Sequence, residues 1–206
     1  MSMNSKNKIP IIEIKRKLLH IISGILPLLL LSYNLINTFA LFIMLCLGIA
    51  VSILSLKFRI PIVSYFLNNF ERDKDKKNLP GRGLIFAFAG CILALKLFPF
   101  QISLAAIAIL TFADPISYLV GCKFGKTKTF LCNTKNIEGS LAGALISSLI
   151  ALFFVPLYLA LPGAIVAMIF ELLTIKIQNL ELDDNFIIPL ATGTAMLLIE
   201  NLIYII

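Results

Sequence analysis

The sequence predicts an all-α integral membrane protein that forms a single domain over residues 1–206. Hydrophobic residues make up 59% of the chain, and the mean hydropathy is +0.97. Charged residues account for only 14%, so a water-soluble domain of this length could not bury the apolar side chains. The apolar residues also fall into long runs separated by short polar stretches. We therefore expect about seven transmembrane helices, a polar site on the cytoplasmic side and a short interfacial helix.

Seven apolar runs are candidates for the transmembrane helices, although several are shorter than the roughly 20 residues of a perpendicular span. They cover residues 18–33, 38–56, 83–98, 102–121, 140–157, 161–175 and 186–206. Residues 59–70 are also apolar, but this segment is too short to span and is flanked by charge. We expect it to form an amphipathic helix at the cytoplasmic interface.

The basic residues predict the orientation, because loops rich in Lys and Arg stay on the cytoplasmic side. Such residues cluster in the N-terminal tail and in the loops after the second and fourth apolar runs. The intervening connections carry almost none, with Lys96 as the exception. We expect a prokaryotic cell membrane, with the N-terminus and the polar site cytoplasmic. The net charge of +7 is then a topology signal, and no nucleic-acid-binding module is recognisable.

Asp114 is the most informative single residue. It lies within an apolar run directly before Pro115. A carboxylate inside a membrane is costly, so it usually faces a partner, an ion or a water-filled cavity. Pro115 cannot donate to the carbonyl of Thr111, which predicts a kink or a break in the helix. Interrupted backbone at membrane depth indicates a site that is buried in protein or lines a cavity.

The first helix carries a polar face. Glu13, Arg16, Lys17 and His20 follow one another at helical spacing, so they share one side of the helix where it enters the membrane. One interpretation is a Glu13–Lys17 surface pair with positive-inside charge and an interfacial His20. The other is a clamp for a phosphate or a lipid headgroup.

The densest polar stretch lies between Asp114 and Ser140, and it combines glycines, lysines and the start of a helix. Its candidate nucleotide-binding residues are Gly121, Gly125, Lys126, Lys128, Lys135, Glu138 and Gly139. Unhindered amides, cationic side chains and a helix N-terminus suit a polyphosphate. The spacing is not that of a P-loop. The alternative is that Gly121 and Gly125 only let two helices pack closely.

Acidic residues outside this stretch are candidates for a cation site. Asp183, Asp184 and Asn185 precede the last apolar run and offer oxygen ligands of the kind that Mg²⁺ prefers. Glu71 closes the interfacial segment, and Glu171 lies inside the sixth apolar run. The alternative for the aspartates is helix capping.

At these residues the chain resembles the CTP-dependent lipid kinase family, which includes dolichol, polyprenol and phytol kinases and CTP-using diacylglycerol kinases. The resemblance covers residues 13–193. It is carried in order by EIKRKLLH, NNFERDK, ADPISYLVGCKFGKTK, NTKNIEGSLAG and ELDDNFIIPLATG. The chain departs from the usual pattern at Ser117, where alanine is usual, and at Asn136, where threonine is usual.

The resemblance implies transfer of the γ-phosphoryl group of CTP to a membrane lipid alcohol, with Mg²⁺ as cofactor. It implies CTP binding by Ser117, Gly121, Gly125, Lys126, Lys128, Lys135, Glu138 and Gly139. It further suggests Asp114, Asp183 and Asp184 as Mg²⁺ ligands, and Arg16, His20, Asp114 and Asp184 as catalytic residues. Glu13, Lys17, Glu71, Glu171 and Asn185 are expected to support the site.

Two other functions stay open from the sequence. A CTP:phosphatidate cytidylyltransferase would use the same nucleotide and a lipid phosphate. However, the signature motif of such enzymes, which ends in Gly-Gly-x-x-Asp-Arg-x-Asp, is missing from this sequence. A small ion-coupled transporter would use Asp114 at a broken helix as its ion site, but no inverted repeat is visible. The identity of the lipid alcohol and the oligomeric state are also open.

Overall fold

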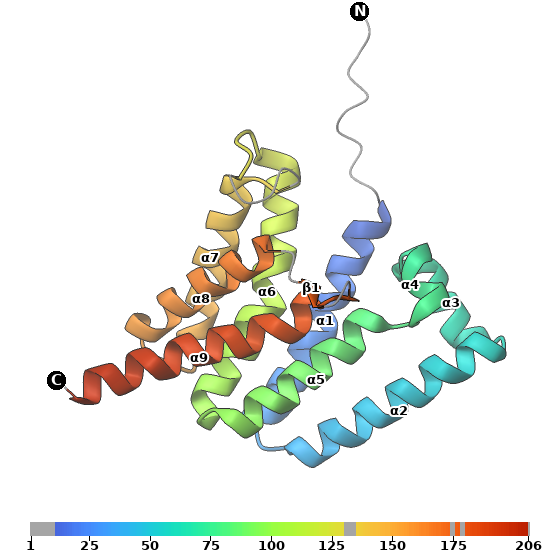
Figure 1. Ribbon diagram of the computed structural model, residues 1–206, viewed down its shortest axis with the longest axis horizontal. Coiled ribbons are helices and arrows are strands. Elements are labelled where there is room, and N and C mark those ends of the chain that lie inside the picture. The colour runs from blue at the N-terminus through green and yellow to red at the C-terminus, as the bar shows by residue number, and fades with distance from the viewer. Residues whose placement is uncertain (1–10, 130–134, 174–175, 178–179, 206) are drawn as a thin grey trace, which may run out of the picture.

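The computed structural model describes residues 11–129, 135–173, 176–177 and 180–205. This part of the chain is almost entirely helical (Figure 1). The helices are α1 (Ile11–Ser32), α2 (Thr38–Lys57), α3 (Pro61–Phe70), α4 (Asp73–Asn78), α5 (Arg82–Leu97), α6 (Phe100–Phe124), α7 (Ile137–Ala151), α8 (Leu157–Leu172) and α9 (Asp184–Ile205). A short hairpin of β1 (Lys176–Ile177) and β2 (Leu180–Glu181) precedes α9, with Lys176 opposite Glu181.

Three helices among the described residues are long and apolar enough to cross a membrane, namely α2, α6 and residues Asp184–Ile203 of α9. The shorter helices α7 and α8 are also apolar. The expected helical fold is therefore confirmed, and these apolar helices are compatible with a membrane protein. Each of the seven apolar runs overlaps a different helix, and the segment 59–70 contains the separate helix α3.

The boundaries of two helices were predicted wrongly. The run at 140–157 contains a helix that ends at Ala151, and the next helix begins at Leu157 rather than at residue 161. After α7 the chain forms hydrogen-bonded turns. In one of them the amide of Phe154 donates to the carbonyl of Ala151 at 2.9 Å. Pro156 then occupies the N-cap of α8, where its missing N–H costs nothing.

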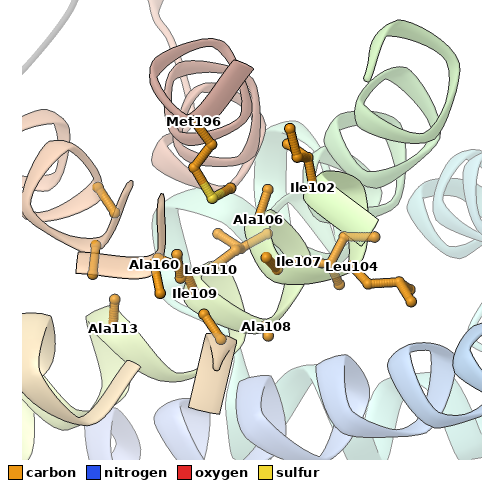
Figure 2. Close-up of a cluster of buried hydrophobic side chains, with 14 of the residues drawn as sticks. Ile102, Leu104, Ala106, Ile107, Ala108, Ile109, Leu110, Ala113, Ala160 and Met196 are labelled. Carbon is orange, nitrogen blue, oxygen red and sulfur yellow. The ribbon is translucent and has the colours of Figure 1, made fainter. Parts of the chain in front are cut away.

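Helix α6 lies at the centre of the bundle and contacts α1, α5, α7, α8 and α9. Its first half is buried at every position from Ile102 to Leu110. Figure 2 shows Ala160 of α8 and Met196 of α9 beside this stretch. The hydroxyl of Ser103 donates to the carbonyl of Ala94 at 2.9 Å, which satisfies a polar group inside this apolar core.

Helix α6 also runs through Pro115 without interruption, so the break considered from the sequence is absent. Pro115 is fully buried, and α7 packs directly against this part of α6. A Cβ atom at Gly143 of α7 would lie 2.7 Å from the carbonyl oxygen of Ala113. The surrounding helices therefore hold α6 together where its own hydrogen bonding is weakened.

Helix α2 lies at the edge of the bundle, with α3 and α4 following at its end (Figure 1). Its main packing partner is α5, and it exposes large apolar side chains such as Phe42, Leu47 and Ile53. On the other side of α5 lies α9, which approaches closely at Gly90, where a Cβ would lie 2.8 Å from the carbonyl oxygen of Asn185. Residues of α1, α2, α3 and α5 line the cavity that forms the candidate site.

Candidate functional site

A cavity of about 1020 Å³ lies between α1, α2, α3, α5, α6, α8 and the start of α9. Its volume is at the upper end of the range for small-molecule sites, so it has room for more than one ligand group. It brings together most residues that the sequence singled out: Glu13, Arg16, Lys17, His20, Glu71, Asp114, Ser117, Gly121, Lys135, Glu171, Asp183, Asp184 and Asn185. These residues span nearly the whole chain.

Asp114 forms an ion pair with Lys17, which joins α6 to α1. The side chains of Lys17 and Asp114 are only 8% and 20% exposed. The ammonium group of Lys17 also lies 5.5 Å from the ring centre of Tyr118. A carboxylate at this depth requires such a partner, and the polar face of α1 provides it. The spacing of Glu13 and Lys17 suggested a local pair, but Lys17 reaches Asp114 instead.

His20 lies one turn deeper on α1 and contacts α6 as well. Its Nε2 atom is 3.2 Å from the carbonyl oxygen of Leu110. Because a carbonyl oxygen only accepts, we assign the ring proton to Nε2, which leaves Nδ1 of the neutral ring as an acceptor. His20 also lines the cavity. It is therefore equipped to take a proton from a hydroxyl group.

A second ion pair connects the partly exposed Lys135 with the buried Glu171. The Nζ atom of Lys135 is 2.8 Å from a carboxylate oxygen of Glu171 and 2.6 Å from its carbonyl oxygen. The side chain of Glu171 is 2% exposed, and the hydroxyl of Ser117 donates to it at 3.3 Å. Burial lowers the pKa of Lys135, but the charge and hydrogen bond of Glu171 more than compensate and raise it overall. Lys135 is thus a cation fixed at the cavity wall.

At the cavity entrance, Glu13 ties α1 to the segment that follows α3. Arg72 donates to both carboxylate oxygens of Glu13, from Nε at 2.8 Å and from Nη2 at 3.2 Å, and Arg16 approaches to 3.3 Å. Burial raises the pKa of Glu13, but the hydrogen bond from Arg72 and the nearby charge of Arg16 lower it by more than burial raises it. The pKa of Glu13 is therefore below its usual value. Sequence reasoning did not single out Arg72, because it begins a dense run of charged residues.

Asp183 has two roles at the start of α9. It accepts from the Nε of Arg82 at 3.2 Å and from the amide of Asn185 at 3.1 Å. The side-chain amide of Asn185 donates in turn to the carbonyl of Gly83 at 3.2 Å. Asp183 thus caps α9, as one interpretation of the sequence held, and it also links α9 to α5. Asp184 lines the cavity.

The acidic side chains do not form a complete metal cage. Within the described residues there is no group of three or more His, Cys, Asp and Glu side chains arranged to hold a metal ion. Mg²⁺ typically needs only one or two carboxylates when phosphate oxygens supply the other ligands. Asp114, Asp183 and Asp184 all line the cavity. Each of these carboxylates is therefore a candidate for a single ligand of an ion that enters together with a phosphorylated ligand.

Five of the predicted nucleotide-binding residues lie outside the lining of the cavity as described: Gly125, Lys126, Lys128, Glu138 and Gly139. Lys126 and Lys128 are exposed. Glu138 accepts from the amide of Thr127 at 3.0 Å. A Cβ at Gly139 would lie 3.0 Å from the Cα of Gly121, so this glycine lets α6 and α7 approach closely. The part of the loop at 130–134 lies outside the described residues.

Glu71 provides a pH-dependent prediction. Burial and the nearby charge of Asp75 raise its pKa to about 7, compared with an ordinary value of 4.5. Its ionisation therefore opposes folding, and the penalty grows from about pH 4.5 to about pH 7. We expect Glu71→Gln to raise the Tm at pH 8 and to leave it unchanged at pH 4.5. Thermal unfolding in detergent across this range measures the difference, and a Tm that is lowered equally at both pH values would contradict it.

Comparison with known proteins identifies a relative but no characterised function. No protein-family model matches the chain, and no solved structure is significantly similar to it. It is 31% identical over 182 residues to the uncharacterized protein MJ1137 of Methanocaldococcus jannaschii. The alignment covers 86% of this chain and 88% of that protein. The chain therefore belongs to the same family as this archaeal protein.

Proposed function

We propose that the protein is a CTP-dependent kinase of a membrane lipid alcohol. In this proposal seven helices, α1, α2 and α5 to α9, cross the cell membrane, and the N-terminus and the cavity face the cytoplasm. The observation that carries the proposal is the cavity itself. It combines buried ionic groups with an apolar wall inside a bundle of apolar helices.

The cavity lining contains both apolar and basic side chains. Val51 of α2 and Ile62, Val63, Phe66 and Leu67 of α3 provide an apolar part, where a lipid could enter from the bilayer. The basic groups that would meet the phosphates are Arg16, Lys17, Arg72, Arg82 and Lys135. A ligand with both an ionic and an apolar part, or two ligands that meet there, matches this mixed lining.

Charge supports the participation of a cation. The carboxyl groups that line the cavity are Glu13, Glu71, Asp75, Asp114, Glu171, Asp183 and Asp184, against five Lys and Arg side chains. Glu71, whose pKa is about 7, is only partly ionised at neutral pH, but the other carboxyl groups still outnumber the basic side chains. A bare triphosphate would therefore meet a net negative wall, and repulsion would weaken its binding. Mg²⁺ bound to the phosphates would neutralise this charge, with Asp114, Asp183 or Asp184 as protein ligands.

The proposed reaction is a direct phosphoryl transfer. The hydroxyl oxygen of the lipid attacks the γ-phosphorus of CTP, the bond from that phosphorus to the β–γ bridging oxygen breaks, and CDP leaves. Nδ1 of His20 is our candidate to accept the hydroxyl proton, and Arg16, Lys17 and Lys135 would stabilise the charge on the phosphoryl oxygens. Positioning and charge neutralisation would provide most of the rate enhancement.

Isotope labelling tests the proposal directly. Purified protein in detergent would receive Mg²⁺, total prokaryotic lipid and CTP that is labelled at either the γ or the α phosphate. We expect label in the lipid fraction from γ-labelled CTP and none from α-labelled CTP. Label from the α position alone would instead identify a cytidylyltransferase. If neither label is transferred and CTP with Mg²⁺ does not stabilise the protein, a nucleotide enzyme is excluded and a transporter becomes the better hypothesis.

The proposed topology makes a separate prediction. Lys77 at the end of α4 and Lys96 at the end of α5 are both exposed. If α5 crosses the membrane, single cysteines at these positions lie on opposite sides. In a background without the native cysteines, a membrane-impermeant maleimide added to intact cells should label the Lys96→Cys variant and spare Lys77→Cys until the cells are lysed. Labelling of both variants before lysis would refute the seven-helix arrangement.

A further inference from the structure

The basic side chains that line the cavity are engaged in ion pairs. Five Lys and Arg side chains line it, and each lies within 3.3 Å of a carboxylate oxygen. A phosphate group can therefore bind one of these cations only by competing with a carboxylate for it. The carboxylate that loses its partner is left with an uncompensated charge, which is costly where it is partly buried. The pairs are Arg16 and Arg72 with Glu13, Lys17 with Asp114, Arg82 with Asp183, and Lys135 with Glu171.

The pair between Lys17 and Asp114 is the most enclosed of these. The side chain of Lys17 is 8% exposed, whereas that of Arg82, the next least exposed of the five cations, is 26% exposed. The ring centre of Tyr118 lies 5.5 Å from the ammonium group and covers it further. Because water has little access to this pair, Asp114 needs another cation in place of Lys17 if that lysine is to bind a phosphate.

The same geometry allows Lys17 to change its partner. Lys17 and Asp114 both line the cavity, so a ligand there has access to each of them. The four-carbon stem of a lysine is flexible, and its ammonium group can donate three hydrogen bonds. It can therefore turn from a carboxylate to a phosphate oxygen while α1 stays in place. Lys135 is held more firmly, because its Nζ also donates to the backbone carbonyl of Glu171 at 2.6 Å.

From these contacts we infer that Lys17 is a built-in counter-ion that competes with a divalent cation for Asp114. The metal ion binds Asp114 when Lys17 leaves it, and Lys17 leaves when a polyphosphate gives it a new anionic partner. The metal ion and the polyphosphate therefore strengthen each other's binding, and by linkage this effect is reciprocal. The inference rests on the proposed kinase function and adds that its site admits Mg²⁺ together with the polyphosphate rather than alone.

Mn²⁺ tests the first half of this exchange, because it prefers the same oxygen ligands as Mg²⁺ and its free form is measured by electron paramagnetic resonance. The experiment uses purified protein in detergent without nucleotide. Lys17→Met leaves Asp114 without its built-in cation, so it should bind Mn²⁺ roughly 5–150-fold more tightly than the unmodified protein, the usual range for the coupling of two sites. Lys17→Gln, which can still donate a hydrogen bond to Asp114, should change the affinity in the same direction and replaces Lys17→Met if that variant folds poorly.

Two controls separate the exchange from a general effect of charge. Arg16→Met removes one positive charge from the same cavity lining, but Arg16 pairs with Glu13 instead of Asp114, so the affinity for Mn²⁺ should change much less. Lys17→Met/Asp114→Asn removes the carboxylate as well, so the gain in affinity seen with Lys17→Met should disappear.

Inorganic tripolyphosphate tests the other half of the exchange. Its binding is measured as the rise in Tm in detergent, with EDTA present to remove divalent cations. Asp114→Asn releases Lys17 from its carboxylate, so metal-free tripolyphosphate should raise the Tm of this variant more than that of the unmodified protein. When Mg²⁺ replaces EDTA, the rise for the unmodified protein should become larger. Lys17→Met/Asp114→Asn lacks the released lysine and should not show the gain of Asp114→Asn.

The inference is overturned if Lys17→Met and Lys17→Gln bind Mn²⁺ no more tightly than the unmodified protein, if Arg16→Met gains as much, or if Lys17→Met/Asp114→Asn keeps the gain. It is also overturned if metal-free tripolyphosphate stabilises Asp114→Asn no more than the unmodified protein. None of these measurements needs kinase activity. Transfer of γ label to lipid by a protein that fails them would uphold the kinase and refute the exchange. A protein that passes them but transfers only α label would retain the exchange and be a cytidylyltransferase.

Discussion

Asp114→Asn is expected to reduce the turnover of CTP by on the order of 10²–10³-fold, the range found when one group that stabilises the charge of the transition state is removed. It should also lower stability, because Lys17 would keep its charge at a buried position without its carboxylate partner. Breaking one side of a buried pair typically costs about 3–5 kcal/mol. Initial rates with γ-labelled CTP and Tm values in detergent measure the two effects.

The double variant Lys17→Met/Asp114→Asn separates these effects. It removes both charges and keeps side chains of similar length, so it should recover most of the Tm that Asp114→Asn loses. Its activity should stay low, since it lacks both the carboxylate and the ammonium group of Lys17 that the proposal places at the phosphates. If the double variant regains activity together with stability, Asp114 is only a structural partner of Lys17. Near-normal turnover of Asp114→Asn itself would show that the reaction does not need this carboxylate and would contradict the proposed site.

Lys135→Met is expected to weaken apparent CTP affinity by roughly 10–100-fold, which corresponds to the loss of one charge-assisted hydrogen bond. Lys135 is the one lysine among the predicted nucleotide-binding residues that lines the cavity as described, and Glu171 holds its ammonium group there. The measurement is the CTP concentration that gives half-maximal transfer of γ label at saturating Mg²⁺.

Two controls accompany this prediction. Lys123→Met removes the same charge from an exposed position at the end of α6, so it reports any general effect of net charge and should leave the CTP dependence unchanged. Lys135→Met leaves the buried Glu171 without its partner and should therefore also lower the Tm. Lys135→Met/Glu171→Gln removes the partner carboxylate as well, so it should recover the Tm while the affinity for CTP stays low. Equal affinities of Lys135→Met and Lys123→Met would show that Lys135 acts only as the counter-ion of Glu171.

The sequence was sufficient to locate the helices, because a long apolar run is a local property. Each of the seven runs overlaps a different helix, and the short segment after α2 forms the separate helix α3. Local rules failed where neighbouring helices decide the outcome. Pro115 removes one hydrogen bond, yet α6 continues through it because α7 and the rest of the bundle surround this position.

The sequence also identified most of the polar residues that line the cavity, since ionisable groups within apolar runs are costly and usually have a partner or a ligand. It could not identify their partners. Lys17 pairs with Asp114 across 97 positions, and Lys135 reaches Glu171 across 36, although sequence spacing suggested that Lys17 would pair with Glu13. The composition of the loop after α6 could not distinguish a phosphate-binding turn from a close helix contact, because both require glycine at similar spacing.

The sequence alone thus determined that this protein is built from apolar helices, which are compatible with a membrane, and which residues within them are polar. Both follow from the cost of placing each side chain in an apolar medium. Only the tertiary structure decided which of those residues share one cavity and which lysine neutralises which carboxylate. Those features depend on how the helices pack against one another. Helix packing is set by the shapes and small residues of distant segments, and no local pattern in the sequence records which segments will meet.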